Sequence, residues 1–147
     1  VQHYDKKHLF TFGGEHKRFT AGTERVVVNF RGVRILLEVC YDLRFPVWSR
    51  NLGDYDMILY VASWPTPRVD AWSALLRARA LETQCMGVDP ACEYSGGSAI
   101  IDPYGKTIAE CPWSRESAVS ADIDMEALQA FRKKFPVLDD ADPFTLI

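Results

Sequence analysis

The residue best placed to do chemistry in this sequence is Cys40, in the stretch LEVCYDLRFP at residues 37–46. It closes an apolar run over residues 33–39, so it stands at the end of a predicted buried strand. A cysteine in that position is either a small buried hydrophobe or a thiolate nucleophile. Only the second interpretation gives the chain a reaction.

The local sequence favours the nucleophile. Pro46 is suited to begin a short helix over residues 46–53 that ends at Gly53, so Cys40 lies in a strand-to-helix turn. Open α/β sheets place their sites at the carboxyl ends of strands. Such a turn exposes the side chain and directs the backbone N–H groups of Tyr41 and Asp42 at a developing oxyanion. A nearby helix N-terminus also favours the thiolate.

A nucleophilic cysteine normally needs a partner that handles protons. The chain has three histidines, His3, His8 and His16. All three lie upstream of Cys40, and no papain-like signature surrounds Cys40. Both observations disfavour a Cys–His pair. Lys6 could stabilise the thiolate and Glu15 could accept and return protons. Each could equally be a solvated side chain, Lys6 at a strand end and Glu15 in a glycine-rich loop.

Strands and helices alternate in the first half of the chain, and strands follow one another later, which predicts an α/β fold with mixed sheets. We expect strands over residues 1–6, 25–30, 33–40, 56–62, 98–102, 107–110 and 117–123, and helices over 46–53, 71–84 and 125–135. A tight turn at Arg31 and Gly32 joins the strands at 25–30 and 33–40 into a predicted hairpin. Asp70 and Asp124 are the predicted N-caps of the two longer helices. The continuous apolar run at residues 35–37 predicts a strand buried on both faces.

The bulk composition excludes several classes. The 147 residues suit one domain, and the net charge of −3 gives no reason to expect nucleic acid. No apolar stretch reaches the roughly 20 residues that span a bilayer. The four cysteines form no CxxC pair and the N-terminus has no signal-peptide pattern, which favours a cytoplasmic chain with reduced thiols. No His and Cys residues have metal-ligand spacing, so we expect no metal.

Two motifs, YDKKHLF at residues 4–10 and VCYDLRFP at residues 39–46, resemble the central motifs of the nitrilase, or carbon–nitrogen hydrolase, superfamily. The resemblance implies an αββα four-layer sandwich and a Glu-Lys-Cys triad that cleaves nitriles or amides through a thioester. It assigns the lysine to Lys6 rather than Lys7, the nucleophile to Cys40, and a second glutamate, 25 residues before the cysteine, to Glu15.

The same resemblance implies that the chain is the C-terminal portion of such a sandwich. The chain starts at Val1, and the family's general-base glutamate lies N-terminal to the lysine motif, in a segment not contained here. We therefore expect one hydrolase domain over residues 1–147 that is incomplete at its N-terminus. On its own it is expected to be inactive or nearly so.

Three stretches, VCYDLRFPVWSRN, YDMILYVASWPTPR and WSALLRARALETQ, are similar to the bacterial ω-amidase-like branch. This branch releases ammonia from 2-oxo acid amides such as 2-oxoglutaramate. The resemblance implies no cofactor and a homodimer or higher homo-oligomer. The alternatives are another hydrolase of the family, acting on N-carbamoyl compounds or deaminated glutathione, and an inactive structural or interaction fragment.

The resemblance also implies substrate contacts. Arg44 is expected to bind the substrate carboxylate, although it could instead pair with Asp42 or Asp56. Trp64 is expected either to form a wall of the pocket or to pack in the core. The same two roles are expected for Phe10. Tyr41 and Asp42 complete the predicted substrate-binding residues. Thr66 or Arg68 could line the pocket as well.

One segment departs from the family pattern. After Gln84 the family continues with a buried strand and an Asn-containing loop, whereas here the chain reads CMGVDPACEYSGGS. We therefore expect a missing or shortened strand between Cys85 and Asp89, and an internal deletion near residues 85–95.

Overall fold

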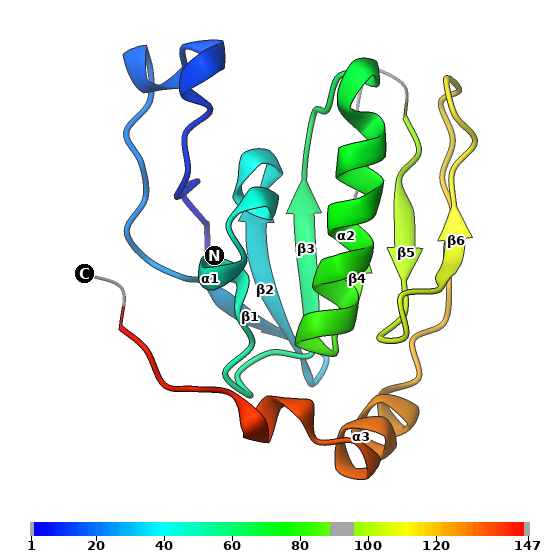
Figure 1. Cartoon of the computed structure of the whole chain (residues 1–147). Helices are drawn as coiled ribbons and strands as arrows, with labels where there is room; N and C mark the ends of the chain where they lie inside the picture. Colours follow the sequence, from blue (N-terminus) through cyan, green and yellow to red (C-terminus); the bar gives the residue numbers. More distant parts are fainter. Residues whose placement is uncertain (1, 89–95, 146–147) are drawn as a thin grey trace.

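The computed structural model describes residues 2–88 and 96–145, which form one mixed sheet with helices. The six strands lie side by side in sequence order. They are β1 (Val27–Phe30), β2 (Val33–Val39), β3 (Met57–Val61), β4 (Met86–Val88), β5 (Ala99–Ile101) and β6 (Thr107–Glu110). The α-helices are α1 (Pro46–Ser49), α2 (Val69–Thr83) and α3 (Met125–Lys134). Figure 1 shows this arrangement.

The predicted hairpin at residues 25–40 is confirmed. β1 and β2 are antiparallel, with Phe30 opposite Val33. The two residues of the turn, Arg31 and Gly32, have φ values of 51° and 85°, the left-handed conformation that a tight two-residue hairpin turn requires. The Asn29 side chain accepts a hydrogen bond from the Gly32 N–H at 3.1 Å and fixes the turn.

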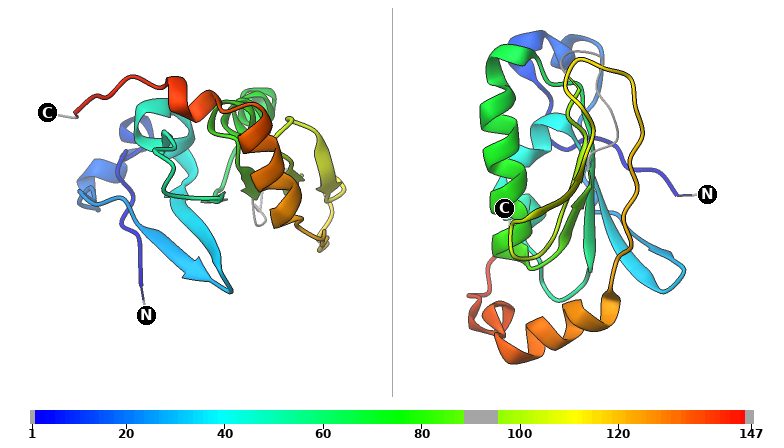
Figure 2. Two further views of the ribbon diagram at one scale, coloured as in Figure 1. Left: turned by 90° about the horizontal axis from the view of Figure 1, so that it is seen from below. Right: turned by 90° about the vertical axis from the view of Figure 1, so that its right-hand side faces the viewer.

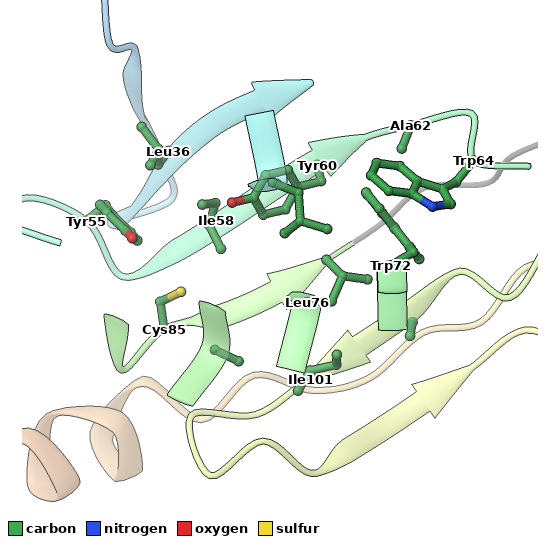
Figure 3. Packing of buried hydrophobic residues seen from close by; sticks show 13 residues of the cluster. Leu36, Tyr55, Ile58, Tyr60, Ala62, Trp64, Trp72, Leu76, Cys85 and Ile101 are labelled. Atoms are coloured by element: carbon green, nitrogen blue, oxygen red, sulfur yellow. The ribbon is translucent and has the colours of Figure 1, made fainter. Parts of the chain in front are cut away.

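The centre of the sheet is parallel, since β2 pairs with β3 and β3 pairs with β4 in the same direction. α2 connects β3 to β4 and lies along one face of the sheet (Figure 2). Alternate residues of β3, such as Ile58 and Tyr60, point at Trp72 and Leu76 of α2 (Figure 3). Burying each such side chain contributes about 1.5–3 kcal/mol, so this layer is the main source of stability.

The opposite face of the sheet is less covered. In β2 only Leu36 and Glu38 are buried, while Ile35 and Leu37 are half-buried. The prediction that this strand is buried on both faces was therefore wrong for the described residues, because α2 covers one face only. The described part of the chain thus supplies one helix layer and one sheet layer of the predicted αββα sandwich (Figure 2).

Other local predictions had mixed outcomes. Residues 2–10 and 117–123 form no strand, because no neighbouring strand pairs with them among the described residues. α1 ends at Ser49 rather than Gly53. Asp70 lies inside α2, which begins one residue earlier, so it is not the cap. Asp124 is the cap of α3 and accepts a hydrogen bond from the Ala127 N–H at 2.8 Å, as predicted.

The end of the sheet where β3 begins is closed by α3 (Figure 1). Arg132 of α3 contacts the Asp56 carboxylate at 2.8 Å, and Arg34 of β2 contacts it at 2.7 Å. Arg132 also donates to the backbone carbonyls of Tyr55 and Gln84. Burial alone would raise the pKa of Asp56, but the hydrogen bonds from Arg34 and Arg132 outweigh it and lower that pKa.

A short strand follows α2 where the sequence predicted a missing or shortened one. β4 has three residues, and it joins β3 to β5. Residues 89–95, on which the predicted deletion falls, lie outside the described residues. No helix in the described part of the chain has the length and apolar character needed to cross a membrane.

Candidate active site

Cys40 is the first residue of a 3-10 turn, Cys40–Arg44, that directly follows β2. Its φ is 49°, in the left-handed region that non-glycine residues rarely adopt. Backbone strain of this kind costs about 1–3 kcal/mol and clusters at functional sites. The thiol is half-buried and lies 3.6 Å from the Ser63 carbonyl oxygen. N–H groups in a first turn, here those of Tyr41 and Asp42, have no acceptor within the turn.

Lys6 and Glu15 form an ion pair close to this turn. The Lys6 Nζ lies 2.9 and 2.7 Å from the two carboxylate oxygens of Glu15, and the Phe10 N–H donates to the same carboxylate at 2.7 Å. Burial would raise the pKa of Glu15, but the hydrogen bonds from Lys6 and Phe10 together lower it. Glu15 is therefore an anion at neutral pH that orients the lysine.

The backbone of Lys6 is held by the end of the same loop. Its carbonyl accepts a hydrogen bond from the Gly22 N–H at 2.9 Å. A Cβ at position 22 would lie 2.1 Å from the Asp5 carbonyl oxygen, so only glycine permits this approach. The loop over residues 7–24 thus returns to Lys6 and fixes its position.

Two hollows meet at Cys40 and Ser63, which line both of them. The first, of about 540 Å³, contains the Lys6–Glu15 pair, and we call it the ion-pair hollow. The second, of about 330 Å³, we call the arginine hollow. Besides Cys40 and Ser63, it is lined by Phe10, Phe12, Tyr41, Arg44, Trp64, Pro65 and Arg68. The thiol therefore lies between the Lys6–Glu15 ion pair and a cationic, aromatic surface.

Asp42 is placed differently from the other predicted residues, because its carboxylate is fully buried behind the turn. It accepts hydrogen bonds from the Tyr4 hydroxyl at 2.9 Å, from the His8 N–H at 2.8 Å and from the Val39 N–H at 3.1 Å. The His8 Nδ1 lies 2.9 Å from it. Its side chain thus joins the segment of Lys6 to the segment of Cys40 and lines neither hollow.

Tyr4 and His8 were not singled out by the sequence interpretation, although both lie in the YDKKHLF motif. The Tyr4 hydroxyl also accepts a hydrogen bond from the Trp48 indole at 3.0 Å, and burial raises the pKa of Tyr4 well above its usual range. The His8 ring stacks on Phe45 with centroids 3.7 Å apart. The signal was the spacing itself, since Tyr4 and His8 flank Lys6 at equal distances along the chain.

Arg44 forms no ion pair with any acid in the described ranges, so the predicted alternative of a pair with Asp42 or Asp56 is wrong. Both carboxylates are occupied by other groups. Arg44 lies over the Trp64 ring, 5.2 Å from its centroid. Trp64 combines the two roles considered for it, because it is buried against Trp72 and also lines the arginine hollow.

Glu38 is a buried acid that the sequence interpretation did not single out. It lies in β2 with 1% of its surface exposed, and the Ser49 hydroxyl donates to it at 2.9 Å. Its other oxygen has no hydrogen-bond partner among the residues described. Burial raises the pKa of Glu38 to about 7, and the hydroxyls of Tyr60 and Ser49 oppose only part of that effect.

No group of three or more His, Cys, Asp or Glu side chains in residues 2–88 and 96–145 could hold a metal ion. The thiol, the ion pair and the turn amides together are equipped for nucleophilic attack on a carbonyl or nitrile carbon.

The sequence of this chain is similar to those of known carbon-nitrogen hydrolases. The carbon-nitrogen hydrolase family model matches residues 1–133. Omega-amidase YafV of Escherichia coli K12 is 50% identical over 154 positions, covering 99% of this chain and 60% of that protein. The 2-oxoglutaramate amidase of Bacillus subtilis is 38% identical, covering 95% of this chain and 57% of its own.

Solved structures give the same fold. A CN-hydrolase superfamily protein from Xanthomonas campestris, which carries an arsenic adduct in its active site, has a TM-score of 0.92 at 43% identity, covering 99% of this chain and 60% of its own. Nit3 of Saccharomyces cerevisiae, a nitrilase superfamily member, has a TM-score of 0.75 at 27% identity, covering 89% of this chain and 51% of its own.

The chain spans about three-fifths of the length of the curated relatives it matches. The alignment to the Escherichia coli protein has 154 positions, more than the 147 residues of this chain. That relative therefore contains residues, within the aligned span, that have no counterpart here.

Proposed function

The chain belongs to the carbon-nitrogen hydrolase family, and on that premise we propose that it acts as an ω-amidase-like hydrolase. The proposed substrates are 2-oxo acid amides such as 2-oxoglutaramate, which would be cleaved to the 2-oxo acid and ammonia. The observation that carries the proposal is the strained Cys40 at the end of β2, lining one hollow with the Lys6–Glu15 pair. The names of the relatives support the substrate class.

In the proposed reaction the Cys40 sulfur attacks the amide carbon and forms a C–S bond. Negative charge develops on the amide oxygen, where the N–H groups of Tyr41 and Asp42 and the Lys6 ammonium stabilise it. The C–N bond then breaks and ammonia leaves, which gives a thioester. Water attacks the thioester carbon, the C–S bond breaks, and the thiol is regenerated with a free carboxylate.

The proton for the leaving nitrogen needs a separate source. Glu15 is ionised at neutral pH and holds Lys6, so it orients the lysine rather than donating that proton. The resemblance assigns the donor, which later activates water, to a glutamate N-terminal to the lysine motif. Activity is therefore expected from a protein that contains both that glutamate and the residues described here.

The test uses a protein that contains that glutamate and measures ammonia release from 2-oxoglutaramate with Cys40→Ser and, as a matched control, Cys111→Ser. Loss of the nucleophile should abolish release, whereas Cys111 lies beyond β6, outside both hollows, and its variant should keep activity. Unchanged ammonia release from Cys40→Ser would contradict the proposal. Release from N-carbamoyl compounds or deaminated glutathione, without release from 2-oxoglutaramate, would favour the alternative hydrolases.

A second measurement separates an enzyme site from an inert fragment. Burial raises the pKa of the Cys85 thiol to about 12, so Cys85 is an internal reference for an unreactive cysteine. Iodoacetamide at neutral pH should label Cys40 much faster than Cys85. Equal, slow labelling of the two would support the structural or interaction fragment.

The proposal also includes self-association of the protein and a cytoplasmic location. Phe12 and Phe19, with 90% and 64% of their surfaces exposed, support a homodimer or higher homo-oligomer, since large exposed apolar side chains favour association. Light scattering after size-exclusion chromatography tests this, and a monomer would contradict it. The reduced Cys85 and Cys111 thiols support a cytoplasmic location, which fractionation of the source cells would test.

A further inference from the structure

The two hollows that meet at Cys40 differ in charge. Among the described residues that line the ion-pair hollow, the one cation, Lys6, is already paired with both oxygens of Glu15, and Asp5 adds a second acid. The charged residues described in the lining of the arginine hollow are Arg44 and Arg68, with no acid among them. An anionic group close to Cys40 is therefore attracted to the arginine hollow and not to the other one.

Both arginines are held in place by aromatic rings of the same hollow. Arg44 lies 5.2 Å from the Trp64 centroid, and Arg68 lies 5.6 Å from the Phe10 centroid. The backbone of Arg68 is fixed as well, because its carbonyl accepts a hydrogen bond from the Trp64 indole at 2.7 Å. Trp64 thus contacts one arginine through its ring face and the other through its N–H.

Neither guanidinium has an acidic partner within the described residues, since none of the salt bridges there involves Arg44 or Arg68. A stacked guanidinium keeps its planar set of N–H donors available to a carboxylate. Stacking alone would explain one arginine over one exposed ring. Two arginines stacked in one hollow beside a strained cysteine, with no acid near them, form a surface suited to a carboxylate.

We infer that Arg68 is a substrate-binding residue that acts together with Arg44, and that the substrate lies across Cys40 in one direction. Its acyl chain extends into the arginine hollow and ends there in a carboxylate, while its amide nitrogen faces Lys6 and Glu15. The inference rests on the proposed amidase function and adds a second arginine to the contacts of the carboxylate that 2-oxo acid amides carry. It also places the leaving ammonia on the side of Cys40 where the Lys6–Glu15 pair lies.

The experiment measures how an anion protects Cys40 from alkylation, so that it needs no turnover. Iodoacetamide alkylation of Cys40 is followed by mass spectrometry with increasing 2-oxoglutarate, or with 2-pentanone, a neutral ketone with the same number of carbon atoms. The variants are Arg68→Met, Arg44→Met and the control Arg77→Met. Arg77 is exposed on α2 and lines neither hollow.

We expect 2-oxoglutarate, and not 2-pentanone, to slow the alkylation of Cys40. Arg68→Met should need on the order of ten- to a hundredfold more 2-oxoglutarate for the same protection, the range that a charge-assisted hydrogen bond covers. Arg44→Met should behave alike, and Arg77→Met should match the parent protein. Arg68→Lys, which keeps the charge and loses the planar donor set, should lose less protection than Arg68→Met.

Equal protection of Arg68→Met and Arg77→Met would overturn the inference, and so would protection by 2-pentanone as strong as that by 2-oxoglutarate. If Arg68→Met fails to fold by circular dichroism, Arg68→Lys and Arg68→Gln carry the same comparison. Failure of the proposed function is distinguishable: protection by 2-oxoglutarate without ammonia release would remove the amidase and keep the anion site. Ammonia release with an unchanged KM in Arg68→Met would keep the amidase function and remove Arg68 from the anion site.

Discussion

The two ends of the parallel strands β2 and β3 use the same residue types in opposite ways. Where β3 begins, Asp56 is buried and paired with Arg34 and Arg132, so acid and base neutralise each other. Where β2 ends, the buried Asp42 is held by a hydroxyl, an imidazole and backbone N–H groups. The Asp56 end is closed by ion pairs. At the Cys40 end, Arg44 and Arg68 have no acidic partner among the described residues.

The contrast separates the contacts that stabilise the fold, at Asp56, from the residues that form the candidate site, around Cys40. At the Asp56 end, removing one partner leaves a buried charge without compensation, which is costly. At the Cys40 end, the hydrogen bonds to Asp42 hold the Lys6 segment against the turn, and Arg44 and Arg68 line the arginine hollow. Variants at the first end should therefore change stability, and variants at the second should change reactivity.

The largest expected effect is on stability and comes from Asp56→Ala. It leaves Arg132, a mostly buried arginine, without its carboxylate, and we expect the free energy of unfolding to fall by about 3–5 kcal/mol in urea denaturation. The control is Asp122→Ala, at an exposed position, where a surface substitution changes stability by less than about 0.5 kcal/mol. A loss below 1 kcal/mol for Asp56→Ala, on the order of a surface change, would show that this end is not closed by its ion pairs.

A second effect concerns Glu38, which lies between the two ends. Its pKa is about 7 in the folded chain against an ordinary value of 4.5, so the folded state binds the extra proton between those values. Stability from this group is complete below pH 4.5 and is lost as the pH rises through 7. From the size of the shift, we expect a loss of about 3 kcal/mol across that window.

Glu38→Gln should remove this pH dependence, because a glutamine stays neutral in the same place. Urea denaturation at several pH values between 4 and 8 measures it, with the exposed Glu116→Gln as the control that keeps the parent slope. Parallel pH profiles of stability for the parent and Glu38→Gln would contradict the prediction, because they would show that Glu38 does not titrate near neutral pH.

A third variant, Asp42→Asn, tests whether the Cys40 end is held by the hydrogen bonds to Asp42. An amide nitrogen would face a donor in place of an oxygen, which costs about 1–3 kcal/mol for a buried group. We expect Lys6 to move away from the turn, and the pH profile of Cys40 alkylation to shift to higher pH as the cation that favours the thiolate is lost.

The control for this variant is Asp102→Asn, since Asp102 accepts two backbone N–H groups in the turn between β5 and β6, far from Cys40 along the sheet. It should leave the alkylation profile unchanged. A loss of stability in Asp42→Asn without any shift of that profile would reduce Asp42 to a structural acceptor.

The sequence predicted the local elements of the chain better than the contacts that support the Cys40 end. The hairpin, the strand-end position of Cys40 and the cap at Asp124 follow from local signals such as turn residues and apolar runs, and all are present. The sequence did not indicate the partners of the Asp42 carboxylate, which accepts hydrogen bonds from residues 34 and 38 positions away along the chain. Partners at that separation follow from the tertiary fold, and no local pattern contains them.

The same limit explains Arg132 and Glu38. Arg132 reads as one of three basic residues in the last turn of α3, a common helix ending, and only the position of α3 below the sheet gives it a buried carboxylate. Glu38 interrupts an apolar strand, and its neighbours Ser49 and Tyr60 come from separate elements. Sequence periodicity marks such a residue as unusual without naming what surrounds it.

The smallest expected effect comes from Asp124→Ala and tests how α3 closes the Asp56 end. Asp124 caps α3 through the Ala127 N–H, and loss of an N-cap costs about 1 kcal/mol. The control is Glu126→Ala in the same first turn, which removes a charge without a capping bond and should cost about 0.3 kcal/mol. Because α3 presents Arg132 to Asp56, a frayed α3 weakens that ion pair, so Asp124→Ala should cost less in an Asp56→Ala background than in the parent. Equal costs in both backgrounds would mean that the start of α3 and Arg132 act independently, and that Arg132 closes this end of the sheet whether or not α3 is fully formed.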